Sequence, residues 1–435
     1  MRVSKHLPAI HVEHHKNTMN CPTEKMPIPD KVYVSMVQHI GAPCQPKVAV
    51  GDLVKVGQVI GDSDAYVSAP IHSGASGKVT AIETTMTSMG IWDPIVTIVL
   101  DKKQEVVEGL APPVVTDKDS FLKAVRDSGL VGLGGAAFPT HVKFNPKNLD
   151  EVDTLIINGA ECEPYITSDY RAMLEDTDYI IGGIKNTMKY LGIKRCIIAI
   201  EENKAPAIKL LRDLLKDSPE IEVMELRSLY PQGAERVLIY EATGRVMPLG
   251  KLPADIGAIV SNITSIITLE KYLQTGMPLV AKRITVDGTA VRTPKNVEVL
   301  IGTPINEIIE FCGGYKRVPR KILMGGPMMG RAIYDDGTPL IKNNNAILAF
   351  DKEWAEFPKE TACINCGRCV KACPLHLMPT SIFKAYDKKD IETLKKLKVP
   401  LCMECGCCSY VCPAKKQLSF INRLAKQLVQ EGGKK

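Results

Sequence analysis

The chain has 435 residues, of which 45% are hydrophobic and 24% charged, a composition typical of a soluble protein with several globular domains. No apolar run approaches the roughly 20 residues that a membrane-spanning helix needs, which argues against an integral membrane protein. The net charge of +6 is concentrated in residues 351–435, which hold 16 Lys and Arg against 9 Asp and Glu, while the rest of the chain is close to neutral.

Fourteen cysteines without a signal-peptide pattern favour metal or redox chemistry in a reducing compartment over disulfides. The first segment, residues 1–31, is rich in His and Pro and has no periodicity, so we expect an extended arm. Its histidines could bind a metal, but no Cys or carboxylate pattern completes a site, and a packed or solvated arm is the better interpretation. They are His6, His11, His14 and His15.

Residues 32–110 consist of short apolar strands separated by glycine turns, a pattern that predicts a small twisted barrel. This region resembles the lipoyl/biotinyl-carrier fold, a barrel sandwich in which a Lys on an exposed hairpin carries the prosthetic group. The hairpin here spans Asp64 to Val67 and contains no Lys, and Lys78 lies within a later strand. We therefore expect the fold without the modification, as a scaffold or docking module.

Residues 115–268 change to alternating strands and helices. The segments 154–158 (TLIIN) and 196–200 (CIIAI) are short continuous apolar runs, as expected for buried parallel strands. Residues 207–217 have apolar side chains at helical spacing with charges on the opposite face. This alternation predicts an α/β domain around a parallel sheet.

Residues 269–345 return to strands and turns, with one short helix over 304–314 that ends at paired glycines. We expect a small α+β module, of the β-grasp type, that contains the segment GGPMMG at 325–330. The last region, residues 350–435, holds a helix-like stretch at 390–398, which predicts a helical module.

Two copies of the pattern C-x2-C-x2-C-x3-C-P lie in this last region. The eight cysteines are Cys363, Cys366, Cys369 and Cys373 in the first run, and Cys402, Cys405, Cys408 and Cys412 in the second. This is the bacterial ferredoxin spacing, in which three Cys of a run bind one 4Fe-4S cluster and the fourth binds the other. Structural zinc sites use two separated C-x2-C pairs instead, so zinc is the weaker interpretation. Cys407 would break the spacing and is left out of the ligand set.

A glycine-rich loop, G-x-x-G-x-G-G followed by A-A-F-P-T-H-V-K, runs from Gly129 to Lys143. Its glycines would let the backbone approach a ligand and present N–H groups to a phosphate. A glycine loop alone is weak evidence, because ordinary glycine turns with an incidental Lys look the same.

The loop resembles the flavin loop of the NADH-binding subunit of respiratory complex I, whose pattern is G-x-x-G-x-G-G-A-x-F-P-T-x-x-K. The segments 158–164 and 230–235 are similar to that family's N-x-D-E-x-E-P and Y-x-x-G-E-E, and Ser261-Asn262 lies where the family has N-N-V-E-T. The resemblance implies a Rossmann-like α/β domain that binds FMN and NAD(H).

The resemblance also assigns individual residues. FMN would be held by Gly132, Gly134, Gly135, Lys143, Asn158, Tyr230, Gly233 and Asn262. Phe138, Glu163 and Glu235 would face the nicotinamide nucleotide, and Glu161 belongs to the same binding segment. Ala160, Ala234 and Ser261 replace polar residues of that family, which removes polar contacts near the flavin.

The complete order of modules, ending with an SLBB-like β-grasp module and two ferredoxin runs, is similar to the RnfC family of the Rnf ferredoxin:NAD oxidoreductase complex. The resemblance implies an enzyme subunit that passes electrons between a ferredoxin-like partner, two 4Fe-4S clusters, FMN and NAD(H). Its partners would be integral membrane and ferredoxin-like subunits and, indirectly, soluble ferredoxin, at the cytoplasmic face of the bacterial cell membrane. The complex would export Na⁺ or H⁺.

Three alternatives stay open. The chain could be a cobalamin reductase of a propanediol-utilisation microcompartment, which shares much of this layout, or a soluble diaphorase with the same cofactors. It could also be a flavin-free electron relay in which the glycine loop is structural. Nucleic acid is the weaker explanation of the basic C-terminal region, because two clusters with eight thiolates carry about four negative charges that offset the excess.

Overall fold

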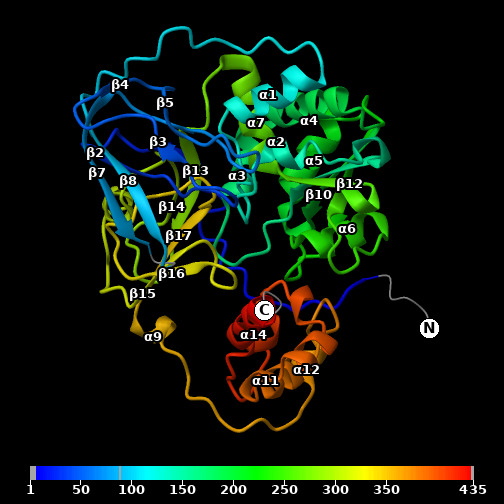
Figure 1. Ribbon diagram of the computed structural model, residues 1–435. Helices are drawn as coiled ribbons and strands as arrows, with labels where there is room; N and C mark the ends of the chain where they lie inside the picture. Colours follow the sequence, from blue (N-terminus) through cyan, green and yellow to red (C-terminus); the bar gives the residue numbers. More distant parts are fainter. Residues whose placement is uncertain (1–5, 88–89, 433–435) are drawn as a thin grey trace.

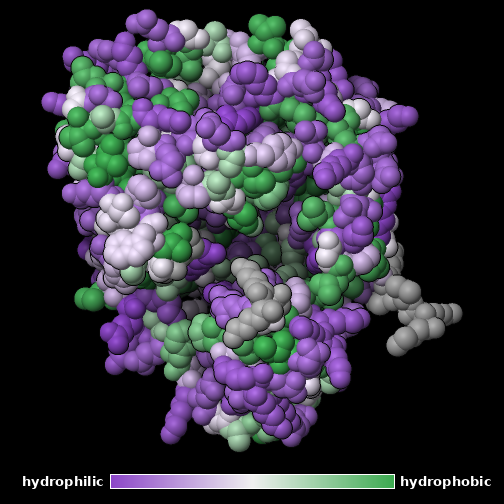
Figure 2. Space-filling view, in the orientation of Figure 1, coloured by the Kyte–Doolittle hydropathy of each residue, from purple (hydrophilic) through white to green (hydrophobic). Residues whose placement is uncertain are grey.

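The computed structural model describes residues 6–87 and 90–432. Figure 1 shows two β-rich modules on one side, an α/β domain on the other, and a helical C-terminal module below them. In the same orientation, Figure 2 shows a hollow where the modules meet, above the C-terminal module. No helix in the described part of the chain combines the length and hydrophobicity that a membrane span requires.

The barrel module confirms the predicted small β-structure. It is built from two antiparallel sheets with the strand orders β2-β8-β7-β4 and β3-β5-β6. The strands are β2 (Lys31–Ser35), β3 (Gln45–Pro46), β4 (Leu53–Val54), β5 (Val59–Asp62), β6 (Ile71–His72), β7 (Gly77–Met86) and β8 (Trp92–Leu100). Their inward-facing residues, including Val34, Ile60 and Val96, form one buried core. The module lies against the α/β domain, since the amide of Ile40 donates to the carbonyl of Ala137 at 3.1 Å.

The α/β domain has the predicted parallel sheet, in the order β11-β10-β9-β12. The strands are β9 (Thr154–Gly159), β10 (Arg195–Glu201), β11 (Ile221–Leu226) and β12 (Ala258–Asn262). The helices are α1 (Lys118–Asp127), α2 (Thr140–Lys143), α3 (Ser168–Glu175), α4 (Thr177–Leu191), α5 (Ala205–Leu214), α6 (Glu235–Thr243) and α7 (Ile263–Thr275), with 3-10 turns at Leu149–Glu151, Glu202–Lys204 and Pro253–Ile256. Both apolar runs predicted as strands are buried, because helices cover the two faces of the sheet.

The β-grasp module is a six-stranded sheet with the order β1-β14-β13-β17-β15-β16. Its elements are β13 (Ala281–Asp287), β14 (Lys295–Leu300), α8 (Ile305–Phe311), β15 (Lys321–Met324), β16 (Arg331–Ile333) and β17 (Ala346–Phe350). The edge strand β1 (Thr23–Lys25) comes from the N-terminal arm and pairs in parallel with β14. The arm is therefore more than an extended segment, because it completes a sheet more than 250 residues away in the chain.

The N-terminal arm is also fastened to the α/β domain. The Nζ atom of Lys16 donates to the carbonyl oxygens of Glu161, Glu163 and Ile166 at 2.7, 2.9 and 2.6 Å. An ammonium group has three N–H donors, so all three are used. This contact could not be predicted from sequence periodicity. The arm has no repeating pattern, and the partners of Lys16 are backbone oxygens far along the chain.

The C-terminal module is helical, as predicted. Its elements are α10 (Arg368–Lys371), α11 (Pro379–Asp387), α12 (Ile391–Lys396), a 3-10 turn (Val399–Leu401), α13 (Cys407–Tyr410) and α14 (Leu418–Gly432), whereas α9 (Lys352–Ala355) packs against β17 of the β-grasp module. Leu377, Ile382, Leu394 and Ala425 form the buried core of the C-terminal module. A long connection after α9 links it to the β-grasp module, and Figure 1 shows this connection looping below the molecule.

Glu163 connects the α/β domain to the β-grasp module. Its carboxylate accepts hydrogen bonds from the amides of Met328 and Met329 at 3.0 and 2.8 Å, within the GGPMMG segment. The same segment reaches the C-terminal module, because a Cβ built on Gly406 would lie 3.2 Å from the carbonyl oxygen of Met328. Three modules therefore meet at this point.

Stability at this junction should depend on pH. Burial raises the pKa of Glu163 from 4.5 to about 7. Because the fold holds this proton more tightly than the unfolded chain, the resulting stability is complete below pH 4.5 and is lost as the pH rises toward 7. Glu163→Gln keeps an acceptor but cannot ionise, so it serves as the reference.

Between about pH 5 and about pH 8, the wild type should lose on the order of 2–3 kcal/mol relative to this variant. Differential scanning calorimetry of both proteins across this range would measure the difference. A gap between the two apparent unfolding temperatures that stays constant with pH would contradict the prediction.

Candidate functional site

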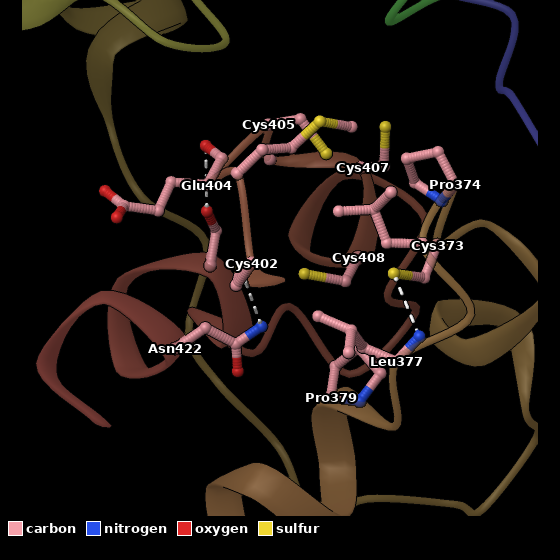
Figure 3. Close-up of a pocket in the computed structure, with 14 residues that line it drawn as sticks. Cys373, Pro374, Leu377, Pro379, Cys402, Glu404, Cys405, Cys407, Cys408 and Asn422 are labelled. Carbon is pink, nitrogen blue, oxygen red and sulfur yellow. Dashed lines mark hydrogen bonds between the residues drawn. The ribbon is translucent and has the colours of Figure 1, made fainter. Parts of the chain in front are cut away.

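The eight cysteines of the two runs line two cavities in the C-terminal module. Cys363, Cys366 and Cys369 share the first cavity with Cys412. Cys402, Cys405 and Cys408 share the second with Cys373, and Figure 3 shows these side chains around it. Each cavity thus takes three cysteines from one run and the fourth from the other, which is the exchange expected in a two-cluster ferredoxin.

The donor set fits 4Fe-4S clusters. Within residues 6–87 and 90–432, no three His, Cys, Asp or Glu side chains converge on a single ion position, and the thiols instead surround the two cavities. A single zinc ion would draw its sulfur ligands to about 2.3 Å from one point. Four thiolates spread around a cavity suit a cubane better, because each sulfur then binds a different iron.

The two runs fold in the same way, because left-handed residues recur at equal spacing. Asn365 and Glu404 have φ angles of 53° and 60°, and the glycines two positions later, Gly367 and Gly406, have 73° and 81°. A short helix begins directly after each glycine. These turns bend the C-x2-C-x2-C segment around its cavity, and glycine adopts the conformation without strain.

The two cysteine sites differ in exposure. We call the Cys363/Cys366/Cys369/Cys412 set the outer site, because Cys366 is exposed and the neighbouring Ile364 is 68% exposed. We call the Cys402/Cys405/Cys408/Cys373 set the inner site, because its three second-run cysteines are buried.

The inner site has extra polar contacts. The Nδ2 atom of Asn422 lies 3.7 Å from the sulfur of Cys402, and the amide of Leu377 donates to the sulfur of Cys373 at 3.3 Å (Figure 3). Cys407 also lines this cavity, beside Cys405. The C-x2-C-x2-C-x3-C pattern leaves Cys407 out of the predicted ligands and does not indicate that its thiol lies at the inner site.

The glycine loop lies at the carboxyl edge of the parallel sheet, where ligands of such folds bind. Gly134 and Gly135 are exposed, and in the described part of the chain the amides of Gly134, Gly135 and Ala136 have no hydrogen-bond acceptor. A Cβ on Gly134 would come within 2.5 Å of Nδ2 of Asn262, whereas one on Gly135 would meet nothing within 4 Å. The loop therefore passes close over Asn262 and leaves free N–H donors beside open space, which fits a phosphate-bearing ligand.

Two strand ends bring the other candidate residues to this loop. Asn158 is the penultimate residue of β9 and lies beside Asn262 at the end of β12, because the two are paired in the strand register. The Nδ2 atom of Asn158 donates to the carbonyl of Gly233 at 2.8 Å, which draws the 230–235 segment to the same edge. Lys143 donates to the carbonyl of Val260 at 3.0 Å, so its amino group lies at the backbone of β12.

Two acidic candidates have their carboxylates engaged by protein groups. Glu161 accepts hydrogen bonds from the amides of Asp169 and Tyr170 at 2.7 and 3.3 Å, at the N-terminus of α3. Asp169 in turn accepts from Nδ2 of Asn262 at 2.7 Å. Glu163 holds the GGPMMG segment, as described above. The other two residues predicted to face the nicotinamide nucleotide are Glu235 and Phe138. Glu235 is exposed as the first residue of α6, and Phe138 is half-buried in the glycine loop.

Tyr230 lies between the glycine-loop region and the inner site. Its side chain is 1% exposed, and among the described residues its hydroxyl has no hydrogen-bond partner. It packs in one apolar cluster with residues of the arm, the α/β domain and the C-terminal module. These are Ile10, Val12, Cys162, Ala372, Cys405 and Cys407.

This cluster joins the two candidate sites by direct packing. The sulfur of Cys162 accepts a hydrogen bond from the amide of Gly233 at 3.5 Å, and Gly233 is held by Asn158 at the glycine-loop edge. The inner site is therefore connected to the α/β domain through buried side chains, whereas the outer site opens at the surface.

Four family models match the chain. They are the RnfC barrel sandwich hybrid domain at residues 7–103, the Nuo51 FMN-binding domain at 125–271, the SLBB domain at 283–332 and the 4Fe-4S dicluster domain at 362–416. The first of these begins at residue 7, so it includes most of the N-terminal arm. The glycine loop lies within the FMN-binding match and both cysteine runs lie within the dicluster match.

Curated relatives match most of the chain. The C subunit of the proton-translocating ferredoxin:NAD(+) oxidoreductase complex of Clostridium ljungdahlii is 44% identical over 381 residues, which cover 86% of this chain and 82% of that protein. The C subunit of the Na(+)-translocating complex of Acetobacterium woodii is 39% identical over 359 residues, or 81% of each chain. The C subunit of the ion-translocating oxidoreductase complex of Rhodobacter capsulatus is 38% identical and covers 89% of this chain and 76% of its own.

Among solved structures, the NAD+-reducing [NiFe]-hydrogenase in its H2-reduced state matches with a TM-score of 0.50 and 18% identity, covering 72% of this chain and 62% of the hydrogenase chain. That likeness concerns the fold alone. The identities to the curated relatives, over most of both chains, show the family: the protein is a member of the RnfC family, the C subunits of ion-translocating ferredoxin:NAD(+) oxidoreductase complexes.

Proposed function

We propose that this protein is the electron-transfer subunit of an Rnf-type ferredoxin:NAD oxidoreductase, carrying two 4Fe-4S clusters and FMN and using NAD(H) as substrate. The observation that supports this most directly is the buried contact of the inner cysteine site with the domain that bears the glycine loop. A flavin exchanges single electrons with iron–sulfur clusters and hydride with a nicotinamide, so it supplies the conversion between the two.

The residues of the α/β domain have separate tasks in this proposal. The free amides of Gly134, Gly135 and Ala136 bind the FMN phosphate, and Asn262 supports the loop from below. Asn158 fixes the segment that carries Gly233 and Glu235. Glu161 and Glu163 act as positioning residues, because their carboxylates are already bonded to protein amides. Gly132, Phe138, Lys143 and Tyr230 complete the set that the family pattern assigns.

The same geometry supports an order for the two clusters. The outer site faces solvent at Cys366 and Ile364 and suits the exchange of electrons with a partner protein. The inner site lies against Tyr230 and Cys162 and suits exchange with the α/β domain. Residues 351–435 carry an excess of seven positive charges, of which about three remain once two clusters are bound, and this suits an acidic ferredoxin-like partner.

The names of the relatives favour the Rnf complex over a cobalamin reductase of a microcompartment. Two of them carry names for different coupling ions, the proton in one and Na⁺ in the other, although both resemble this chain over four-fifths of its length or more. We therefore assign the choice of ion to the membrane subunits. We place this protein on the cytoplasmic face of the cell membrane, held there by those partners.

The metal ligands can be tested by mutating the fourth cysteine of each run, which is assigned to the cluster of the other run. Cys412→Ser should remove the cluster of the outer site, although Cys412 belongs to the second run, and Cys373→Ser should remove that of the inner site. Anaerobically purified protein should contain about eight iron atoms, and each variant about four. Cys21→Ser, outside both cavities, is the control and should leave the iron content unchanged.

Electron paramagnetic resonance of the two variants would identify which signal is lost. Cys412→Ser should lose the same signal as Cys366→Ser, and Cys373→Ser the same signal as Cys405→Ser. The opposite pairing would show that each run binds its own cluster, contrary to the geometry described above.

The flavin site can be tested at Gly135. A Cβ there would meet no protein atom within 4 Å, so Gly135→Ala should fold normally while its methyl group enters the space assigned to the ligand. We expect the FMN content of the purified protein to fall by about tenfold with the iron content unchanged. Gly337→Ala, in an exposed turn of the β-grasp module, should retain FMN. Full flavin content in Gly135→Ala would contradict this placement, and wild-type protein with iron but no flavin would favour the flavin-free relay.

A further inference from the structure

Three side chains of the β-grasp module reach the carbonyl groups of the glycine loop. Lys342 donates from Nζ to the carbonyl oxygens of Gly129 and Pro70, both at 2.7 Å. Lys282 donates from Nζ to the carbonyl oxygens of Leu133 and Lys342 at 2.8 and 3.0 Å. Asn343 donates from Nδ2 to the carbonyl oxygen of Gly135 at 2.9 Å. Three carbonyls of the loop are thus held from the same neighbouring module.

Two of these side chains are lysines inside the protein. Lys282 is 4% exposed and Lys342 is 1% exposed. Burial lowers the pKa of Lys282 to about 7 and that of Lys342 to about 8, so each spends part of its time as a neutral amine near neutral pH. An amine still has two N–H donors, so both hydrogen bonds of each lysine are available in either protonation state. Polar groups this deeply buried are tolerated because their hydrogen bonds are made.

Because the peptide bond is planar and trans, these contacts with carbonyl groups also fix the direction of the N–H groups on the other side of the loop. In each peptide unit the C=O and the following N–H point in opposite directions. The contact of Lys282 with the Leu133 carbonyl therefore directs the N–H of Gly134 away from the β-grasp module. The contact of Asn343 with the Gly135 carbonyl does the same for the N–H of Ala136. These are two of the loop amides that have no acceptor among the described residues.

We propose that Lys282 and Asn343, supported by Lys342, are positioning residues that aim the amides of the glycine loop at the phosphate of the bound nucleotide. This inference rests on the proposed FMN site and assigns the β-grasp module a task in it. The module does not touch the ligand in this arrangement. It fixes the orientation of peptide groups that are otherwise free to rotate in a glycine-rich segment, which reduces the entropy lost on binding.

A purely structural role for these side chains makes a different prediction. If they only joined two modules, their removal would lower stability but leave the orientation of the loop amides and the affinity for FMN unchanged. The comparison needs variants that remove the donor without adding bulk. Lys282→Met and Asn343→Ala meet this requirement, and Asn343 is only half-buried, so its variant is expected to fold.

The experiment uses the full chain, purified anaerobically with its iron intact. The FMN dissociation constant is measured from the fluorescence of flavin released on dilution, and hydrogen exchange of residues 129–138 is followed by mass spectrometry in flavin-depleted samples. Lys295→Met is the matched control, because this lysine lies in the same β-grasp sheet but pairs with Glu24 at 2.6 Å, outside the loop.

Lys282→Met should bind FMN about tenfold more weakly and Asn343→Ala several-fold more weakly, with faster exchange of the loop amides in both. The control should match the wild type in both measurements. If Lys282→Met does not fold, the FMN affinity and hydrogen exchange of Asn343→Ala test the inference alone. FMN affinity within about twofold of the wild type, together with unchanged exchange, would overturn the inference while leaving the flavin site intact. Wild-type protein that binds no FMN would instead overturn the proposed function and this inference together.

Discussion

The structure depends on one buried contact, in which the inner cysteine site packs against the α/β domain around Tyr230 and Cys162. The residues of the C-terminal module in this contact lie more than 140 residues from Tyr230 in the chain, and the arm, the α/β domain and the C-terminal module all contribute to it. The arm contributes Ile10, whose amide and carbonyl pair with Tyr230 at 2.8 and 2.9 Å. The GGPMMG segment closes the same junction through Glu163. The chain thereby keeps its two redox regions in fixed contact.

Both candidate binding loops of the α/β domain are held by lysines from outside it. Lys16 of the arm engages three carbonyls of the 161–166 loop, and Lys282 and Lys342 engage carbonyls of the glycine loop. In the glycine loop, the carbonyls bound by Lys282 and Asn343 leave the amides of Gly134 and Ala136 on the opposite side, which is the polarity that an anionic nucleotide needs. We therefore propose that the β-grasp module contributes to the binding site through the shape that it gives the glycine loop, whereas Lys16 of the arm fixes the backbone of the 161–166 loop.

Much of this organisation could be predicted from local patterns. The apolar runs at 154–158 and 196–200 became adjacent parallel strands, and the cysteine spacing indicated cavities with exchanged fourth ligands. The features that could not be predicted depend on contacts between segments that are distant in the sequence. The strand at Thr23–Lys25 has no apolar alternation, because its pairing is through backbone groups at a sheet edge. The family pattern places Glu161 and Glu163 at the cofactor site, which stays a prediction, but it could not indicate the protein amides that their carboxylates bind, because only the folded chain brings these near.

An anaerobic reduction with NADH, followed by electron paramagnetic resonance and by flavin absorbance on the same sample, tests the central claim most directly. If the inner site and the flavin domain form one continuous redox unit, NADH will bleach the flavin and produce signals of reduced 4Fe-4S clusters in the isolated chain, at least in part. Bleached flavin with both clusters remaining oxidised, even when a chemical reductant of similar potential reduces them, would contradict the account.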